Sequence, residues 1–339
     1  MRRLLSSIPV LLGALFITFM LTSIMPGDPI EQLMGNHFNI NTYNLLRHKY
    51  GFDEPIYIRF FVYLGNLFTG NWGQTFVVGK GMDVWTLIWQ RFPRTAELAI
   101  LAIVFAAILG VNTGVISATH RNKTQDTVIR GSSLIGVAMP VFWLGLLFQL
   151  AFANKNFPWT DFFPQIGYMS VNTIVYYPVT SITGFTLIDS LIQGNFFAFW
   201  DHVQHLVLPT ITLGLITLAS ISRQTRSSML EVLEQDYIRT ARAKGVKEYT
   251  VIHKHALNNA MIPATTIIGL SIAGLLGGAV LTENVFSYDG LGMLLVEAIS
   301  DKDYFLINAI TFLLTLIFVI VNLITDIIYG FLDPRIRLE

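Results

Sequence analysis

The sequence predicts an all-α polytopic membrane protein with six transmembrane helices. The 339 residues are 53% hydrophobic and only 13% charged, whereas soluble domains are roughly 25% charged. Six segments with few or no charges reach, or nearly reach, the roughly 20 residues that a helix needs to cross a bilayer. A crossing segment must satisfy its backbone hydrogen bonds internally, so we expect each of the six to be a helix.

The first crossing segment is an uncharged run of 22 residues, Leu4 to Met25, behind Arg2 and Arg3. It is longer than the roughly 7 to 15 apolar residues of a secretory signal. Residues 1–25 are therefore predicted to be an N-terminal transmembrane helix that is retained. The small residues before Pro26 leave cleavage open as the alternative.

Residues 26–91 are predicted to form an extracytoplasmic loop region. Apolar side chains recur within it at helical spacing, so we expect short helices on the outer surface. This apolar stripe consists of Ile58, Phe61, Val62, Leu64 and Leu67.

The other five crossing helices are expected at about 96–118, 131–153, 206–222, 262–282 and 305–331. The third of these is the shortest, and its helix should extend through residues 202–205 or into Arg223. Pro140 predicts a kink within its helix. Pro263 fits the first turn of the next-to-last helix.

A second outside region, residues 154–205, is rich in aromatic residues and proline, as in "FPWTDFFPQIGY". Such residues suit a membrane interface or a cap over the helices.

The basic residues predict the orientation. With the N-terminus inside, 14 of the 22 lysines and arginines fall in inside segments. The outside loops after the third and fifth helices hold only Lys155 and Lys302. The positive-inside rule therefore places both termini in the cytoplasm. The six basic residues of the first outside loop do not oppose this, because a loop of that length is translocated largely regardless of its charge.

The most highly charged stretch is "DYIRTARAKGVKEYTVIHKHALNNAMIP", Asp236 to Pro263. It predicts two amphipathic helices, because apolar residues recur at helical spacing on each side of Gly245. Gly245 can adopt a positive φ, which would end the first helix and turn the chain. The first stripe is Leu233, Tyr237 and Ala241, and the second is Tyr249, Ile252, Ala256 and Ala260.

Two interpretations fit this helix pair. It could rest on anionic lipid as an interfacial hairpin, or it could dock on a cytoplasmic partner. Acidic residues such as Glu234 and Asp236 mingle with the basic ones, which weighs mildly against a pure lipid anchor.

This stretch resembles the EAA loop of ABC importer permeases, in the form found in the dipeptide and oligopeptide branch. Arg239, Thr240 and Ala241 stand at the Glu-Ala-Ala positions, and Gly245 stands at the position of the motif's glycine. The pattern's Glu, its second residue and its later Pro are absent, and the later positions hold His255, Leu257 and Asn258. These departures are typical of the peptide branch.

The resemblance covers nearly the whole chain. Segments similar to the first-permease (B-type) subunits of that branch occur in the same order, among them "PGDP", "FPRTAELAI", "MPVFWLG", "HLVLPTITLGL", "LTENVFSYDGLGMLLVEAI" and "NLITDIIYGFLDPR". We therefore identify the chain as resembling a permease subunit of this family.

The resemblance implies the type I importer fold, with an ABC-type transmembrane domain at 92–332, a coupling loop at about 231–260 and a cytoplasmic tail at 333–339. It implies uptake of di- or oligopeptides across the cell membrane by alternating access, with oligosaccharides or metal chelates as alternative substrates. The expected partners are a homologous second permease subunit, two ATP-binding subunits, an extracytoplasmic binding protein and membrane lipid.

The resemblance also implies a site, because the EAA loop of such permeases sits in a groove of an ATP-binding subunit. The residues expected to make that contact are Tyr237, Arg239, Thr240, Ala241, Lys244, Gly245, Tyr249, Ile252, His255 and Leu257. The sequence contains no G-x-x-x-x-G-K-[S/T] loop. We therefore expect ATP and magnesium to bind partner subunits, and we expect no cofactor and no enzyme activity on this chain.

Three further groups of residues carry expectations. Small residues allow close helix approach, so helix packing or the translocation path is assigned to Gly269, Gly274, Gly277 and Gly278. Glu283 and Asp326 are a possible polar membrane site. The rival function is a secondary carrier driven by these two residues. The absence of inverted-repeat signals in the sequence counts against that function. Asp201, His202 and His205 more readily form a polar helix start than a metal site, so no metal is predicted.

Overall fold

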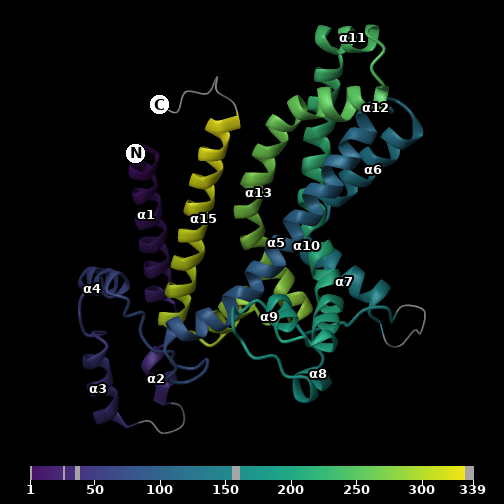
Figure 1. Cartoon of the computed structure of the whole chain (residues 1–339). Coiled ribbons are helices and arrows are strands. Elements are labelled where there is room, and N and C mark those ends of the chain that lie inside the picture. Colours follow the sequence, from purple (N-terminus) through teal and green to yellow (C-terminus); the bar gives the residue numbers. More distant parts are fainter. Residues whose placement is uncertain (1, 26, 35–38, 155–160, 333–339) are drawn as a thin grey trace. The chain divides into compact units, whose positions relative to one another are not determined.

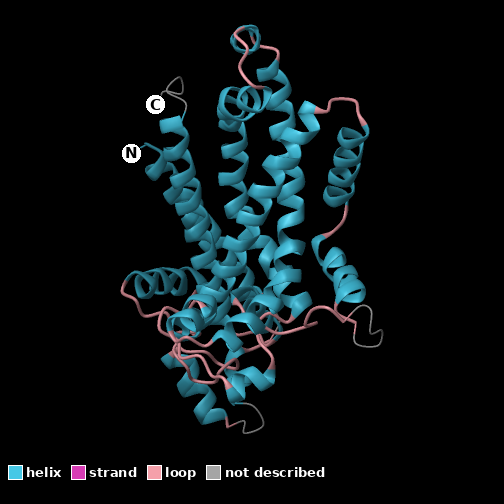
Figure 2. Ribbon diagram, turned by 45° about the vertical axis from the view of Figure 1, so that its right-hand side comes forward, coloured by secondary structure: helices cyan, strands magenta, loops and turns pink. Residues whose placement is uncertain are grey.

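The computed structural model describes residues 2–25, 27–34, 39–154 and 161–332, and these residues form helices joined by loops (Figure 1; Figure 2). Within these ranges, the only strand-type pairing is at two isolated bridges, Gln74 with Asp83 and Ala153 with Asp161. The all-α prediction is confirmed.

The helices of the first half of the chain are α1 (Arg2–Ile24), α2 (Pro29–Met34), α3 (Ile40–Lys49), α4 (Ile56–Phe68), α5 (Val84–Thr119), α6 (Thr124–Ala138) and α7 (Val141–Phe152). Those of the second half are α8 (Val171–Tyr176), α9 (Thr186–Ile192), α10 (Phe196–Leu233), α11 (Asp236–Ala243), α12 (Glu248–Thr250), the π-helical turn η2 (Val251–Ala256), α13 (Leu257–Phe286), α14 (Leu291–Ser300) and α15 (Tyr304–Leu332).

Four helices are long and apolar enough to cross a membrane. They are α5, α10, the continuous helix Glu248–Phe286 formed by α12, η2 and α13, and α15 over Tyr304–Thr325. Helices α6 and α7 provide a fifth crossing if they are counted as one broken span. The chain is therefore a multi-pass membrane protein. Helix α1 is 23 residues long, and its Ile8–Ile24 part is a shorter apolar helix.

The prediction of one kinked helix over 131–153 is partly correct, because the chain is interrupted at Pro140 but does not continue as one helix. The structure has two helices there, α6 and α7, bent by 111° relative to each other. Met139 between them is extended, with φ −89° and ψ 135°, the conformation that a following proline favours. Pro140 stands at the N-cap of α7. Because proline has no N–H to continue the helical hydrogen bonds, it ends one helix and begins the next.

Three helices are longer than their apolar runs. Helix α5 begins at Val84 rather than near residue 96, and α10 extends beyond 206–222 at both ends. Helix α13 begins at Leu257, so the prediction that Pro263 lies in its first turn is wrong. An apolar run marks where a helix can meet lipid, whereas the residues beyond it stay helical because they pack inside the protein. The last helix, α15, agrees with the predicted 305–331.

The chain divides into two compact units. Unit 1 consists of residues 1–95 and 289–319, and unit 2 consists of residues 96–288 and 320–339.

In unit 1, helix α4 packs on α1 through aromatic rings. The ring centroid of Phe19 lies 5.6 Å from that of Tyr63. The short helices predicted within 26–91 are confirmed as α2, α3 and α4, but the face predicted for α4 is only partly correct. Leu67 is buried, whereas Phe61 and Val62 are 68% and 57% exposed. Helix α4 is apolar on both sides, so spacing alone does not reveal which side packs.

In unit 2, helix α10 connects two groups of short helices. Helices α8 and α9 lie at one end of it, and α11 and α12 lie at the other (Figure 1). Helix α5 approaches α10 closely at two glycines. A Cβ added to Gly110 would lie 3.0 Å from the Leu218 carbonyl oxygen, and one added to Gly114 would lie 2.8 Å from the Ser222 carbonyl oxygen. Only residues without a side chain permit this backbone distance.

Gly114→Ala is therefore expected to destabilise the protein by about 1 to 3 kcal/mol, because the added methyl group meets backbone atoms that cannot move aside cheaply. The matched control is Gly136→Ala in α6, where the added Cβ would meet its nearest neighbour only at 4.0 Å. Both substitutions raise helix propensity equally. Thermal unfolding of the purified protein in detergent should therefore show a lower midpoint for the first variant than for the second. Equal midpoints would contradict the close α5–α10 packing.

Candidate functional site

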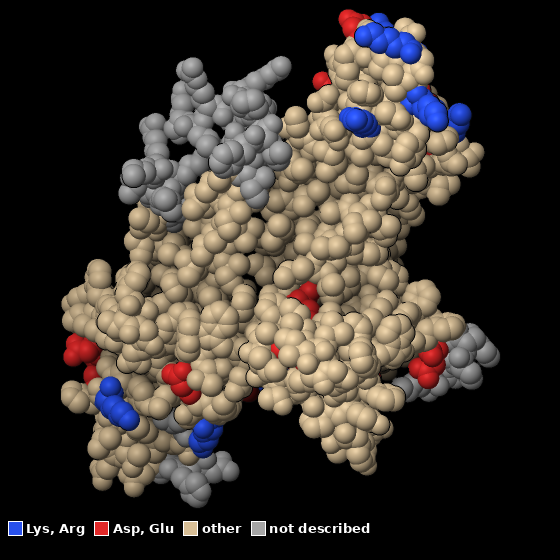
Figure 3. Space-filling view, viewed as in Figure 1, with Lys and Arg blue, Asp and Glu red and all other residues tan. Residues whose placement is uncertain are grey.

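The candidate site is the surface formed by α11, α12 and η2 at the end of α10. We call it the coupling surface (residues 231–260), after the role that the resemblance implies for it. Lysine and arginine side chains gather over α11 and α12 (Figure 3). Beneath them lies a hydrophobic cluster that includes Ile238, Val251 and Met229, each 0% exposed. The coupling surface is therefore anchored to α10 by its own apolar core, with its charged side facing outward.

The turn between the two helices of this surface depends on Gly245. Its φ is +74°, a left-handed conformation that glycine adopts without steric cost. The Gly245 N–H donates to the Arg242 carbonyl at 3.0 Å, and the Val246 N–H donates to the Ala241 carbonyl at 3.3 Å. A side chain at Gly245 would meet no atom within 4 Å. The prediction of a positive-φ turn here is confirmed, and the residue is required for its backbone conformation, not for lack of space.

Side chains on both sides of the turn hold the two helices together. The guanidinium of Arg242 donates to both carboxylate oxygens of Glu248, at 3.1 and 2.7 Å. The Tyr237 hydroxyl donates to the His255 carbonyl at 3.3 Å and accepts from the Asn259 amide at 2.7 Å. The coupling surface can therefore move as one body with α10 and α13.

The residues predicted to contact a partner differ in exposure. Tyr249 is 73% exposed and stacks on His253, with ring centroids 4.1 Å apart. Tyr237 is 42% exposed. The remaining exposed members of the predicted set are Arg239, Thr240, Lys244 and Gly245, and the half-buried ones are Ala241, Ile252, His255 and Leu257. Six of the ten residues are therefore exposed and four are half-buried, on consecutive helices and the turn between them.

The apolar stripes predicted for the two helices are only partly correct. Ala256 and Ala260 are buried, but they pack inside unit 2 and so cannot fill a cleft in a partner. In α11 the buried residue is Ile238, next to the predicted Tyr237. In a short helix, either of two adjacent positions can fit the spacing of an apolar stripe. Contacts with α10 determine which of the two side chains is buried, and here it is Ile238.

The four glycines of α13 separate into two pairs. A Cβ on Gly269 would overlap Cγ2 of Thr325, and one on Gly278 would lie 3.1 Å from Cδ1 of Leu213. These two glycines pack within unit 2. Gly274 and Gly277 are exposed, and a Cβ on either would meet nothing within 4 Å. Only the second pair is open to another subunit.

Of the two residues in the possible polar membrane site, Glu283 is fully buried in unit 2. The side chain of Asp326 lies outside the described part of the structure, although its backbone belongs to α15.

The segment "DHVQH" lies in the second and third turns of α10, which begins at Phe196, and not at the helix start that the sequence predicts. Asp201 accepts from the backbone N–H and the hydroxyl of Ser170, at 2.7 and 2.6 Å. His202 is fully buried, with one ring nitrogen 2.6 Å from the Tyr168 carbonyl and the other 2.8 Å from Glu97. No cluster of three potential metal ligands occurs among the described residues.

The loop before α9 is ordered by Asp189, a feature that the sequence did not reveal. This carboxylate accepts from the backbone N–H groups of Ile182, Thr183 and Gly184, at 2.8 to 3.1 Å. Burial alone would raise the pKa of Asp189, but a hydrogen bond from the Thr183 hydroxyl at 2.7 Å, together with the three backbone N–H groups, holds it below its usual value. An ionised carboxylate therefore organises the loop before α9. The signal in the sequence was the run "TGFTLID", whose Asp follows a loop that offers free N–H groups.

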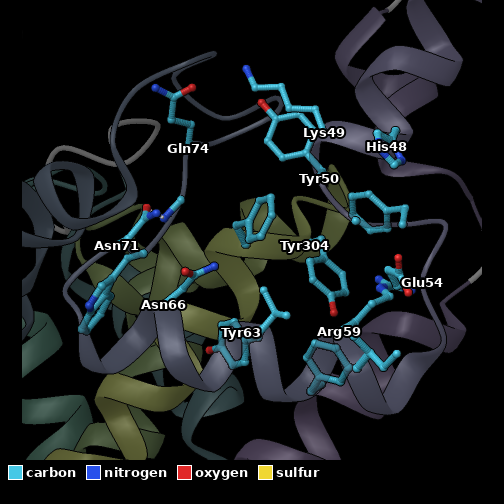
Figure 4. A pocket seen from close by; sticks show the side chains of 18 of the residues that line it. His48, Lys49, Tyr50, Glu54, Arg59, Tyr63, Asn66, Asn71, Gln74 and Tyr304 are labelled. Carbon is cyan, nitrogen blue, oxygen red and sulfur yellow. Dashed lines mark hydrogen bonds between the residues drawn. The ribbon is translucent and has the colours of Figure 1, made fainter.

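A pocket of about 550 Å³ in unit 1 was also missed. Figure 4 shows Glu54 and Arg59 on one side of it, with Asn71 and Gln74 opposite. The guanidinium of Arg59 lies over the rings of Phe52 and Tyr304, 4.5 and 5.5 Å from their centroids. The walls of this pocket combine aromatic faces with amide groups. Such a lining is suited to a peptide segment.

Two protein-family models together match nearly the whole chain. A family model described as "Binding-protein-dependent transport system inner membrane component" matches residues 102–338, and a model of the N-terminal part of such membrane components matches residues 1–99. The chain is 41% identical over 337 residues to the dipeptide transport system permease protein DppB of Alkalihalophilus pseudofirmus, covering 99% of this chain and 98% of the relative.

Two other relatives show similar coverage. The di/tripeptide transport system permease protein DppB of Pseudomonas aeruginosa is 42% identical over 338 residues, covering 99% of this chain and 97% of the relative. The oligopeptide transport system permease protein AppB of Bacillus subtilis is 38% identical over 336 residues, covering 99% and 98%.

Proposed function

Because the chain belongs to the family of binding-protein-dependent transport system inner membrane components, we propose that it is the permease subunit of an ATP-driven importer of di- or oligopeptides. The observation that carries this proposal is identity of about 40% over nearly the full length to permeases of dipeptide and oligopeptide systems. The chain itself is a transport subunit, and ATP hydrolysis takes place on partner subunits.

The membrane topology belongs to the proposal. At 1.5 Å per residue, the 23 residues of α1 are about 35 Å long, enough to cross the roughly 30 Å hydrocarbon core as a sixth span. The excess of basic residues in alternate loops supports cytoplasmic termini and a cytoplasmic coupling surface. The pocket beside Arg59 would then open on the extracytoplasmic side, from which a binding protein delivers the substrate.

We propose the partners that such an importer needs: a second permease subunit, two ATP-binding subunits and the extracytoplasmic binding protein. The coupling surface, with Tyr249 and Tyr237 outermost, suits the contact with an ATP-binding subunit. Gly274 and Gly277, whose added side chains would be unobstructed, suit close approach by the second permease. ATP and magnesium belong to the ATP-binding subunits.

The mechanism that we propose is alternating access driven through the coupling surface. Closure of the ATP-binding subunits pushes on α11 and α12, which the Arg242–Glu248 pair and the buried Ile238 join into one body. That body is continuous with α13 and packed on α10, so the push becomes a shift of two membrane helices.

The test is peptide uptake by the complete importer in proteoliposomes. Uptake of a labelled dipeptide should require ATP on the side of the membrane where the ATP-binding subunits lie. An ionophore that collapses ion gradients should leave this uptake unchanged. Uptake that survives without ATP but stops with the ionophore would instead support a secondary carrier working through Glu283 or Asp326. Competition by an unlabelled oligosaccharide or metal chelate, but not by a peptide, would reassign the substrate.

A further inference from the structure

A cavity of about 580 Å³ lies in unit 2 between α6 and α10, with Ser117 of α5 at its wall. Three arginines line it: Arg130 of α6, and Arg223 and Arg226 of α10. Hydroxyl groups, including that of Ser222, lie between them. A cavity lined by several guanidinium and hydroxyl groups matches the hydrogen-bonding needs of a phosphate.

One of these arginines is already neutralised. Arg226 forms two hydrogen bonds with Asp126, at 2.7 and 2.9 Å. Asp126 also accepts from the Ser117 hydroxyl at 2.6 Å and from the Asn122 N–H at 3.0 Å. The carboxylate is thus fully engaged, and the Arg226–Asp126 pair adds no net charge to the cavity.

The other two arginines leave the cavity positive. Within the described part of the chain, neither Arg130 nor Arg223 forms an ion pair with a carboxylate, and both side chains are exposed. Two unneutralised guanidinium groups on adjacent helices therefore face a space large enough for a phospholipid headgroup.

The position of these two arginines selects the kind of phosphate. Arg223 directly follows the apolar residues 206–222, and Arg130 lies four residues before Leu134, where the apolar part of α6 begins. Both therefore mark the boundary between the hydrocarbon and the aqueous side. Leu134 lines the same cavity and is 70% exposed, and Ile135 beside it is 56% exposed. A soluble phosphate would leave this apolar wall unused, whereas the acyl chains of a lipid would cover it.

We infer that this cavity binds the phosphate of an anionic phospholipid in the cytoplasmic leaflet, with Arg130 and Arg223 as its cationic ligands and Leu134 against the acyl chain. The leaflet follows from the orientation proposed above, and the inference is independent of which substrate is transported. Basic pockets between membrane helices near the cytoplasmic surface are suited to such headgroups.

The test is native mass spectrometry of the full chain in detergent with added dioleoylphosphatidylglycerol, compared with dioleoylphosphatidylcholine. We expect tighter binding of the anionic lipid by the unmodified chain. Each basic side chain near an anionic lipid contributes about fivefold, so R130Q/R223Q should bind phosphatidylglycerol roughly 30-fold more weakly. Phosphatidylcholine carries the same phosphate but offsets its charge with a choline cation, so its binding should weaken by a smaller factor. The single variants should each lose about fivefold, which keeps the test informative if the double variant fails to fold.

The matched control is K247Q/K254Q, which removes two exposed basic residues from the coupling surface and not from the cavity. It should bind phosphatidylglycerol as the unmodified chain does. An equal loss in this control, or unchanged binding by R130Q/R223Q, would overturn the inference. So would displacement of the lipid by inorganic phosphate at equal concentration, which would indicate a soluble anion. Displacement by a dipeptide but not by its C-terminal amide would assign the cavity to a substrate carboxylate instead.

Discussion

Gly245→Pro is expected to leave the chain inserted in the membrane and to abolish ATP-driven uptake by the assembled importer. Proline holds φ near −65°, whereas Gly245 has a φ of +74°, and proline also lacks the N–H that donates to Arg242. The turn would therefore open, and the Arg242–Glu248 pair across it would separate. The crossing helices would still insert, because their apolar runs are unchanged.

The measurement is the ratio of peptide taken up to ATP hydrolysed in proteoliposomes. Gly245→Asn is the matched control, because asparagine tolerates the left-handed region better than other side chains and should retain most of the coupled uptake. A second variant, Tyr249→Asp, leaves the turn intact and changes the most exposed aromatic residue of the coupling surface. It too should lower the ratio. If both variants transported peptide with an unchanged ratio, the assignment of this surface to coupling would be wrong.

Asp126→Ala is expected to destabilise the protein by about 3 to 5 kcal/mol, because it leaves a partly buried charge without its partner. Asp126 is 0% exposed and is bound by Arg226, Ser117 and Asn122. Its removal would leave Arg226 unpaired in a space that the carboxylate filled. The packing of α6 on α10 depends on this group, so the loss would be seen as a large decrease in the thermal midpoint of the purified protein.

Two comparisons make this prediction specific. Asp236→Ala removes a carboxylate from an exposed pair with Arg239, and surface pairs of this kind contribute little. It should leave the thermal midpoint nearly unchanged. The double variant Asp126→Leu/Arg226→Leu removes both charges together and should recover much of the lost stability. A double variant as unstable as Asp126→Ala would show that the interaction between the charges is not the cause.

Features that depend on neighbouring residues were predictable from the sequence. The Gly245 turn is an example, because a glycine between two amphipathic helices has one obvious conformational role. The helix at 305–331 is another, since a long apolar run leaves the backbone no alternative to a helix in lipid. The family resemblance rested on segments of this local kind and is confirmed by the comparisons.

Features that depend on distant residues were not predictable. Pro140 signalled an interruption, but whether it kinks one helix or separates two depends on how α6 and α7 pack. The buried residue of α11 was misplaced by one position, because Tyr237 and Ile238 are distinguished only by contact with α10 and α13. Helix α4, apolar on two sides, presented the same ambiguity.

The sequence by itself determined the all-α fold class, the longest apolar helices and the glycine turn between the two charged helices, because hydrophobic runs and a glycine turn act over a few helical turns. Only the tertiary structure decided which polar groups meet. Asp126 and Arg226 are 100 residues apart in the chain, as Glu97 and His202 are 105 apart. The cavity between Arg130 and Arg223 has the same origin. Helix packing brings these residues together. The periodicity of a single helix predicts which of its faces is buried, but not which residue of another helix will contact it.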